Sequence, residues 1–600
     1  MPLSVSSIYP SDASRELYRF ASRRSVIHST EGIVACSQPL AAKCGLEVLR
    51  AGGNAADAAV AVAAGLNVTE PASTGIGGDM FILFWDAAAK KVHAINGSGR
   101  SGADCKLDVI RKDLGIPHGV GGGIPSTSAH AVTVPGAAAG WIDTVESLGS
   151  GKLGLDEILG PAIQLAERGS PVHEEAAIFW ANAESQLRAA SPNFAELLKQ
   201  DASAKDGVRA PQPGEVMRNP SLARTFRALV SQGKKGFYTG RVAEEIVAIV
   251  RNKGGHMSLD DLEHHLDAGR EDVEAVSIKF RGQGLDDKGI KLWEHPPSGQ
   301  GIVALMALGI IQQMQEQGKI PIFGPQDFNT APYLHAIIEA LRLAFSDAHW
   351  FVTDPGVVEV PVKGLLSDAY LAERAKLFNP SRAARHLCHG SPNSPALQSC
   401  DTVYFAVSDA QGNAASFINS NYAGFGTGMI PRGCGFALHN RGSNFSLHAG
   451  HPNQLAPRKR PYHTIIPAVV TNLTDGSLHS VFGVMGGFMQ PQGHVQVLLG
   501  QIVGRLNPQQ ALDAPRVRVF VSDTDSQGEP EWTVNVESGM PSATIDGLRE
   551  LGHRVKAVVD DKTRDMFGRG QIIRYTVDDD GTPIWSAGSD MRADGAAYPA

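Results

Sequence analysis

The sequence predicts a large α/β protein in which helices alternate with strands at first and strands dominate later. Its 600 residues are too many for one ordinary core, which indicates two or more domains or one large layered body. A hydrophobic fraction of 42% and a charged fraction of 19% are typical of a globular chain. The 66 glycines and 35 prolines indicate many tight turns between its elements.

Charge and cysteine usage exclude several classes of protein. The net charge of −8 is mild over this length, and no run of Lys or Arg indicates a nucleic-acid surface. Residues 1–7 lack the pattern of a secretory signal, and the apolar stretch Ala55–Leu66 is too short for a membrane span. Six cysteines without CxxC spacing fit a reducing compartment. We therefore expect a cytoplasmic protein with neither a nucleic-acid nor a membrane partner.

In the first part of the chain helices are predicted to alternate with strands, and residues from about 135 to 275 are predicted to be mainly helical. Asn54 is a good N-cap for an Ala/Val helix over 55–67, whose lack of a polar face predicts burial. The glycine loop Thr74–Asp79 precedes a strand, Met80–Trp85, whereas a dinucleotide-binding loop follows a strand, so no such site is expected. Further helices are expected at Ala137–Glu146, Leu155–Arg168, Arg241–Lys253, Ile302–Gln315 and Ala331–Ser346.

The polar stretch 380–401 is predicted to be an exposed linker, and the residues after it are predicted to be richer in strands. Two strands, Thr402–Ser408 and Ala414–Ser420, flank the Gly-containing hairpin turn Asp409–Asn413. The remaining predicted elements are strands at Ile465–Thr471, Ser480–Val484 and Trp532–Glu537, and a helix at Val495–Leu506.

Thr402, directly after this linker, is the candidate catalytic nucleophile. A linker that runs into a buried strand beginning with Thr is the arrangement that a self-cleaving precursor needs. Cleavage of the Asp401–Thr402 bond would free an α-amine beside a hydroxyl, so one residue would supply both base and nucleophile. Thr is also common in strands because of its branched Cβ, so its position alone leaves both interpretations open.

Other chemistries lack their motifs. The turn Gly486-Gly487 can present backbone N–H groups to a developing oxyanion, although such a pair is more often only a tight turn. The chain has no Gly-x-Ser-x-Gly elbow, HExxH helix or Walker loop. Its histidines, including His264-His265, lack the spacing of metal ligands. We expect neither a metal ion nor another cofactor.

Several short motifs together resemble the γ-glutamyltranspeptidases. They occur in the same order as in that family, from about residue 30 to residue 597. They are Gly53-Asn54-Ala55-Ala56-Asp57-Ala58, Gly75-Ile76-Gly77-Gly78, Pro296-Pro297-Ser298-Gly299, Asp401-Thr402-Val403-Tyr404, Gly412-Asn413-Ala414, Phe425-Gly426-Thr427-Gly428 and Val484-Met485-Gly486-Gly487.

The resemblance implies a four-layer αββα N-terminal-nucleophile hydrolase fold with additional peripheral helices. It implies a precursor that cuts itself into fragments 1–401 and 402–600, which stay associated as one body. Thr402 would attack a small-molecule amide, and water or an amine would accept the acyl group. Gly486 and Gly487 would form the oxyanion hole, and Ser420 takes the place of a second Thr that supports the amine of the nucleophile.

The resemblance weakens at the positions that bind substrate. The family's Arg for the α-carboxylate of the γ-glutamyl group aligns with Ser98, and Arg100 can replace it if the loop 96–99 curls inward. The acidic residue that pairs with the α-ammonium aligns with Asn444, which hydrogen-bonds but carries no charge.

Three further binding positions also differ from the family. A Ser-Ser pair is replaced by His463-Thr464, and a binding Asn aligns with Tyr422, with Asn419 and Asn421 close by. The leading hypothesis is a hydrolase or acyltransferase that acts on γ-glutamyl amides such as glutathione. The alternatives are an amidase for dicarboxylic-acyl amides or for small amides such as oxamate, and a non-catalytic binding protein.

Overall fold

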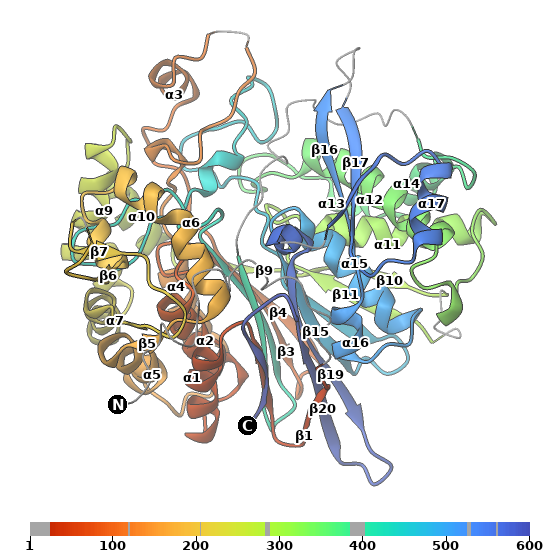
Figure 1. Ribbon diagram of the computed structural model, residues 1–600, viewed down its shortest axis with the longest axis horizontal. Helices are drawn as coiled ribbons and strands as arrows, with labels where there is room; N and C mark the ends of the chain where they lie inside the picture. The colour runs from red at the N-terminus through yellow and green to blue at the C-terminus, as the bar shows by residue number, and fades with distance from the viewer. Residues whose placement is uncertain are drawn as a thin grey trace.

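The computed structural model describes residues 24–600, except 118–119, 205, 283–287, 385–401, 525–529 and 560–561. Two seven-stranded antiparallel sheets pack face to face, and helices cover the outer face of each (Figure 1). Both sheets contain strands from either side of residue 402, so the two halves of the chain share one body. The predicted αββα arrangement is confirmed.

The first sheet has the strand order β1-β20-β19-β15-β14-β11-β10. Its strands are β1 (Ile27–Ser29), β20 (Pro583–Ser589), β19 (Arg569–Val577), β15 (Leu478–Met485), β14 (Ala468–Asn472), β11 (Ile290–Glu294) and β10 (Val276–Phe280). The second sheet has the order β21-β2-β12-β13-β3-β4-β9. Its strands are β21 (Ala596–Pro599), β2 (Ile33–Cys36), β12 (Val403–Ser408), β13 (Ala414–Ser420), β3 (Asp79–Asp86), β4 (Lys91–Gly97) and β9 (Asp272–Val273).

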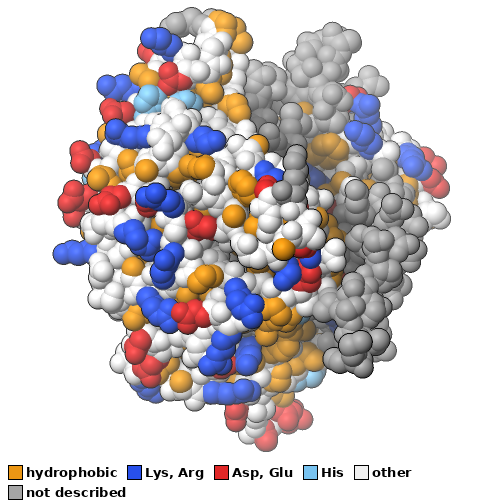
Figure 2. All heavy atoms as spheres, turned by 60° about the vertical axis from the view of Figure 1, so that its left-hand side comes forward, with side chains coloured by type: hydrophobic (Ala, Val, Ile, Leu, Met, Phe, Trp, Pro, Cys, Tyr) orange, Lys and Arg blue, Asp and Glu red, His pale blue; other side chains and the backbone are white. Residues whose placement is uncertain are grey.

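Helices on the side of the second sheet form the larger hydrophobic core with it. They are α1 (Pro39–Arg50), α2 (Ala55–Thr69), α4 (Ala137–Leu148), α5 (Leu155–Arg168), α7 (Pro220–Gln232), α8 (Lys235–Tyr238), α9 (Gly240–Asn252) and α10 (Leu259–Ala268). Two elements lie further out, α3 (Leu107–Asp113) and α6 (Glu174–Ala190). On the face in Figure 2, Lys and Arg side chains are interspersed with Asp and Glu.

The other helices pack against the first sheet and form a second core with it. They are α11 (Gly301–Glu316), α12 (Ala331–Phe351), α13 (Val362–Leu365), α14 (Asp368–Lys376), α15 (Met489–Ile502), α16 (Pro508–Asp513) and α17 (Ser542–Glu550). A small sheet of β16 (Val517–Thr524), β17 (Pro530–Glu537) and β18 (Val555–Val559) lies beside them. The short strands β5 (Ser170–Pro171), β6 (Lys199–Gln200), β7 (Val208–Arg209) and β8 (Val216–Met217) form two further pairs.

β12 lies in the middle of the sandwich, and all six of its residues are buried. It pairs with β2 and β13 in its own sheet and contacts β15 and β19 of the facing sheet. Side chains that alternate along this strand therefore point to two faces that are both buried, and neither face is exposed to solvent. The predicted hairpin is confirmed, because β12 and β13 pair in register from Val403–Asn419 to Ser408–Ala414 around the turn 409–413.

The helix predicted over 55–67 is confirmed as α2, which extends to Thr69 and is buried throughout. Asn54 caps it, since its side chain accepts hydrogen bonds from the amides of Ala56 and Asp57. The Asp57 carboxylate accepts in return from the Asn54 amide at 3.1 Å, which completes a capping box.

Several predicted boundaries were wrong: the helix expected at Ala331–Ser346 is α12, which continues to Phe351, and prolines bear on two further cases. The helix expected at Val495–Leu506 is α15, which begins six residues earlier, because Pro491 lies in its first turn, where proline is tolerated. The strand expected from Ile465 begins at Ala468, after Pro467, which has no N–H to donate to a ladder. Most of the predicted linker 380–401 lies outside the described residues, since only 380–384 are described. No helix in the described part of the chain is long and apolar enough to cross a membrane.

Replacing Asn54 by Ala should lower the stability of the protein by about 1–2 kcal/mol. The change removes the cap of α2 and the hydrogen bond from Asn54 Nδ2 to Leu148 O, which measures 2.7 Å. The measurement is the midpoint of urea unfolding. The matched control is Asn252→Ala at the exposed end of α9, which should shift the midpoint little. Equal midpoints for the two variants would contradict the capping role.

Candidate active site

Thr402 directly precedes β12 and is fully buried between the two sheets. Its Oγ1 lies 3.0 Å from the Oγ of Ser420, at the end of the neighbouring strand β13. Ser420 Oγ also accepts a hydrogen bond of 2.8 Å from the amide of Tyr422. The two hydroxyls that the sequence singled out are thus in direct contact. Asp401, on the other side of the predicted cleavage site, lies outside the described residues.

A buried arginine binds the backbone at Thr402. Arg569 on β19 donates to the carbonyl of Thr402 at 3.5 Å and forms 3.0 Å ion pairs with Glu70 and Glu175. Burial raises the pKa of Glu175, and the nearby Arg569 opposes this rise. The guanidinium therefore neutralises buried acidic groups while it contacts the predicted nucleophile. No sequence motif marks this group, because Glu70, Glu175 and Arg569 are far apart along the chain.

Gly486 and Gly487 form the turn between β15 and α15, with φ angles of +124° and +59°. Side chains other than glycine rarely adopt these angles, so the turn requires both glycines. The preceding Met485 pairs with Arg569 in the sheet, and its sulfur accepts from the amide of Tyr404 at 3.4 Å. These contacts place the turn close to the start of β12, as an oxyanion hole requires.

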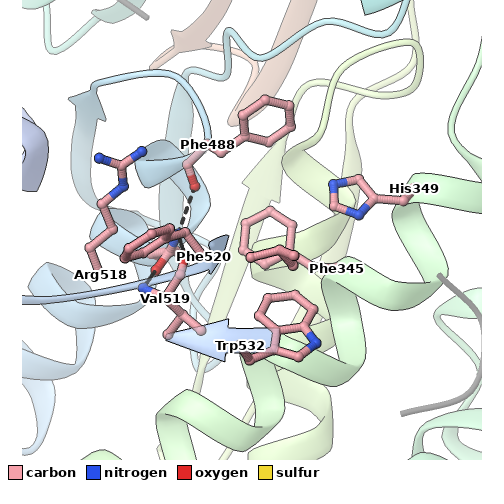
Figure 3. Close-up of a pocket in the computed structure, with 9 residues that line it drawn as sticks. Phe345, His349, Phe488, Arg518, Val519, Phe520 and Trp532 are labelled. Carbon is pink, nitrogen blue, oxygen red and sulfur yellow. Dashed lines mark hydrogen bonds between the residues drawn. The ribbon is translucent and has the colours of Figure 1, made fainter. Parts of the chain in front are cut away.

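Side-chain amides bind the turn and the residue that follows it. Gln300 Nε2 donates to Gly487 O at 2.9 Å and to Thr464 O at 2.7 Å. Gln492 donates to the carbonyls of Phe488 and Val519, each at 3.0 Å. Figure 3 shows the small aromatic pocket that lies there, with Phe488 facing helix α12. The turn and Phe488 are therefore anchored to neighbouring segments.

The predicted binding residues separate into two groups. Tyr422, Asn444, His463 and Thr464 are buried close to one another, around a residue that the sequence analysis did not single out, Arg441. The Arg441 guanidinium lies 4.7 Å from the centre of the Tyr422 ring and donates to Thr464 Oγ1 at 2.6 Å. Asn444, which lies with Arg441 in the short helix η6 (Arg441–Asn444), donates to Tyr462 O at 2.9 Å.

Asn421 and Arg100 have other partners. Asn421 is buried and donates to Pro71 O at 3.0 Å. Arg100 forms an ion pair with Glu271, whose other oxygen lies 2.8 Å from Arg460. Arg100 thus has a carboxylate partner within the protein, and its predicted role toward substrate stays a prediction.

Asp79, at the end of the predicted glycine loop, balances the charge of Arg441. Its Oδ2 lies 3.3 Å from His439 Nδ1, 3.7 Å from His463 Nε2 and 4.0 Å from Arg441 Nε. Burial raises the pKa of Asp79, but the two histidines and Arg441 outweigh it and hold the pKa well below its usual range.

Burial and the nearby Arg441 lower the pKa of His463 well below its usual value. The buried Asp79 carboxylate therefore lies beside the buried Arg441 guanidinium, with two imidazoles around it. Burial of Arg441 could not be expected from its sequence position, since arginine is rarely fully buried.

A buried threonine at the head of a central strand, inside an αββα body, is the arrangement of an N-terminal-nucleophile hydrolase. The family model for γ-glutamyltranspeptidase matches residues 41–600. The chain is 34% identical to a glutathione hydrolase-like proenzyme, YwrD, of Bacillus subtilis, over 96% of this chain and 99% of that protein. It is 32% identical to an oxamate amidohydrolase proenzyme of Klebsiella pneumoniae, over 95% and 98% of the two chains.

Among solved structures, a cephalosporin acylase from Bacillus halodurans is similar, with a TM-score of 0.82 and 38% identity. The match covers 100% of this chain and 99% of that one. The protein therefore belongs to the γ-glutamyltranspeptidase family, and it is an enzyme of the amidohydrolase type. These relatives carry names with different substrates, so membership of the family leaves the acyl group open.

Replacing Ser420 by Ala should slow self-cleavage and amide hydrolysis by about 10- to 100-fold. The change removes the hydroxyl beside Thr402 and leaves the buried amide of Tyr422 without that acceptor, a loss of about 1–3 kcal/mol. The rates are measured by gel electrophoresis of the precursor and by release of an anilide product.

The matched control for this prediction is Ser416→Ala. Ser416 is an equally buried serine on β13, whose hydroxyl bonds to Tyr404 and to the amide of Ala468 instead. This variant should lose stability but keep its rates per folded molecule. Unchanged rates in Ser420→Ala would contradict a supporting role for that hydroxyl.

Proposed function

We propose that this enzyme is a self-processing threonine amidohydrolase whose acyl substrates carry a carboxylate but need no α-ammonium group. The observation that carries the processing step is the 3.0 Å contact between Thr402 and Ser420 at the head of β12, directly after the predicted linker. The names of the relatives, which are proenzymes, support the same step. Fragments 1–401 and 402–600 would remain associated, because both sheets contain strands of each.

In the mature enzyme the free α-amine of Thr402 takes the proton of its own hydroxyl, and the oxygen attacks the amide carbon. Ser420 orients this hydroxyl, and the backbone amides of Gly486 and Gly487 stabilise the oxyanion. The leaving amine takes the proton, and an acyl ester remains on Thr402. Water then hydrolyses the ester, or an amine accepts the acyl group.

The choice of acyl group rests on the charges beside the nucleophile. Three consecutive contacts connect Thr402 to Arg441: Thr402 with Ser420, Ser420 with the Tyr422 amide, and the Tyr422 ring with the guanidinium. Arginine binds carboxylates through two parallel hydrogen bonds, so a carboxylate at the far end of an acyl chain fits this side chain. Asn444 replaces the acidic residue that a γ-glutamyl α-ammonium group would need. These features favour acyl groups of dicarboxylic acids, of which the oxalyl group of oxamate is the shortest.

A γ-glutamyl amide is the second candidate. It is supported by glutathione hydrolase proenzymes among the relatives, one of them 28% identical from Bacillus subtilis over 87% of this chain. An acylase proenzyme from a Pseudomonas strain is also 28% identical, over 88% of this chain, and supports the first candidate equally. The intact set of Thr402, Ser420 and the two glycines weighs against a non-catalytic binding protein.

Thr402→Ala should remain a single chain without amidase activity, whereas the wild type separates into two fragments, the smaller beginning at Thr402. The variant lacks the hydroxyl that attacks the preceding peptide bond. The measurements are denaturing gel electrophoresis and N-terminal sequencing. Thr402→Ser should still be cleaved, and so should the control Thr427→Ala, which removes another buried threonine hydroxyl. A wild type that stays whole with full activity would refute the mechanism.

Arg441→Gln should raise KM for a glutaryl anilide by about 10- to 100-fold and alter hydrolysis of an uncharged valeryl anilide much less. The change removes a charge-assisted hydrogen bond worth about 1.5–3 kcal/mol. Arg441→Lys, which keeps the charge near Asp79, should show a smaller defect. The measurement is steady-state kinetics on the processed enzyme, with γ-glutamyl anilide in the same panel.

Arg100→Gln is the matched control, because Arg100 lies outside the series of contacts that connects Thr402 to Arg441, so its replacement should change these constants little. If Arg100→Gln raised KM while Arg441→Gln did not, Arg100 would be the carboxylate-binding residue. Turnover of γ-glutamyl anilide alone would favour the second candidate.

A further inference from the structure

Three side chains with metal-binding atoms gather at the surface of the helical layer. They are Asp113 at the end of α3, His130 in the short helix η3 (Ala129–Ala131), and His256 in the loop between α9 and α10. Asp113 Oδ2 lies 2.6 Å from His256 Nε2 and 3.7 Å from His130 Nε2. One ligand atom from each residue lies within 4.8 Å of the other two, and the two rings stack with an angle of 15° between their planes.

The only other such group in the described part of the chain has more partners within the protein, whereas the first group has the 2.6 Å hydrogen bond between His256 Nε2 and Asp113 Oδ2. This other group comprises His335, Glu339 and His553. His335 bonds to His553 at 2.7 Å and to Asn379 O at 2.8 Å. Glu339 pairs with Arg342 at 2.5 Å, so its carboxylate is already neutralised by a cation. A metal ion would have to break each of these contacts, and this buried group is structural.

The first group has the properties of a metal site. Its members come from three separate segments, and Asp113 and His256 are partly exposed, so an ion can reach them from solvent. The His130 side chain is only 8% exposed, and its imidazole offers a nitrogen ligand close to the ligand atoms of Asp113 and His256.

We propose that Asp113, His130 and His256 form a zinc site, with solvent completing the coordination of the ion. Two imidazoles and one carboxylate suit zinc, whereas magnesium and calcium prefer oxygen ligands. Zinc bonds of about 2.0–2.2 Å place tetrahedral ligand atoms roughly 3.3–3.6 Å apart. The two separations at Asp113 lie on either side of this range, so small side-chain rotations bring the atoms into place.

Such an ion would connect α3, η3 and the loop between α9 and α10, next to the candidate active site. η3 contacts η6, and the Cα of Gly442 lies so close to the backbone of Ala131 that a Cβ there would be 2.8 Å from Ala131 O. Gly442 directly follows Arg441. Zinc would therefore stabilise the segment that supports the predicted carboxylate-binding residue. The site takes no part in the proposed reaction, and its existence does not depend on it.

The test is zinc titration of the tag-free, chelator-treated wild-type protein by isothermal calorimetry and thermal unfolding. We expect one zinc ion per chain, bound with a Kd in the micromolar range or tighter, and a rise in Tm with zinc. Asp113→Asn and His256→Gln should each weaken binding by about tenfold or more, and the double variant should abolish it. The control His264→Gln, an exposed histidine on α10 outside the group, should bind as the wild type does.

The same titration decides against the proposal if wild-type protein shows no saturable binding below about 100 µM zinc. Unchanged binding in the double variant would equally overturn it. Comparison of Tm without metal shows whether each variant is folded. If a variant is unfolded, a zinc-edge anomalous map of wild-type crystals serves instead, with a peak expected among the three side chains and its absence counting against the site.

Discussion

The burial of β12 on both faces is the constraint on which the rest of the structure depends. A strand with no wet face must satisfy its backbone through neighbouring strands and its side chains through packing. β2 and β13 supply the backbone partners, and the facing sheet covers the other side. Thr402, at the head of this strand, is thereby held in a dry interior beside Ser420. A hydroxyl buried in this way interacts with neighbouring protein groups, and these groups determine its orientation and reactivity.

The buried charges follow from the same constraint. An ion removed from water must be paired, and two such groups border the start of β12 and the end of β13. Arg569 neutralises Glu70 and Glu175 and binds the Thr402 carbonyl. Asp79 and Arg441 form the second pair, with histidines around them. The first group contacts the predicted nucleophile, and the second contains the proposed carboxylate-binding residue, so the proposed reaction and recognition have separate electrostatic supports.

This separation explains how one family can include relatives named for glutathione, oxamate and cephalosporin. The hairpin β12–β13 belongs to the second sheet, and the Gly486-Gly487 turn directly follows β15 of the first sheet, so changes there would disturb the core. The residues near Arg441 lie in η6 and neighbouring loops, where substitutions change charge without changing the fold. Substrate preference can therefore diverge while the chemistry of the nucleophile stays the same.

The sequence by itself determined the elements whose signals are local, and the structure decided which distant side chains meet. The cap at Asn54, helix α5 and the β12–β13 hairpin were predictable because residues a few positions apart specify them. Arg100 was chosen for its nearness to an aligned position, yet its partner Glu271 is 171 residues away. Arg441 and the Asp113–His130–His256 group also depend on distant segments. Pairing and burial of charges are properties of the tertiary structure, because they require those segments to pack together and exclude water.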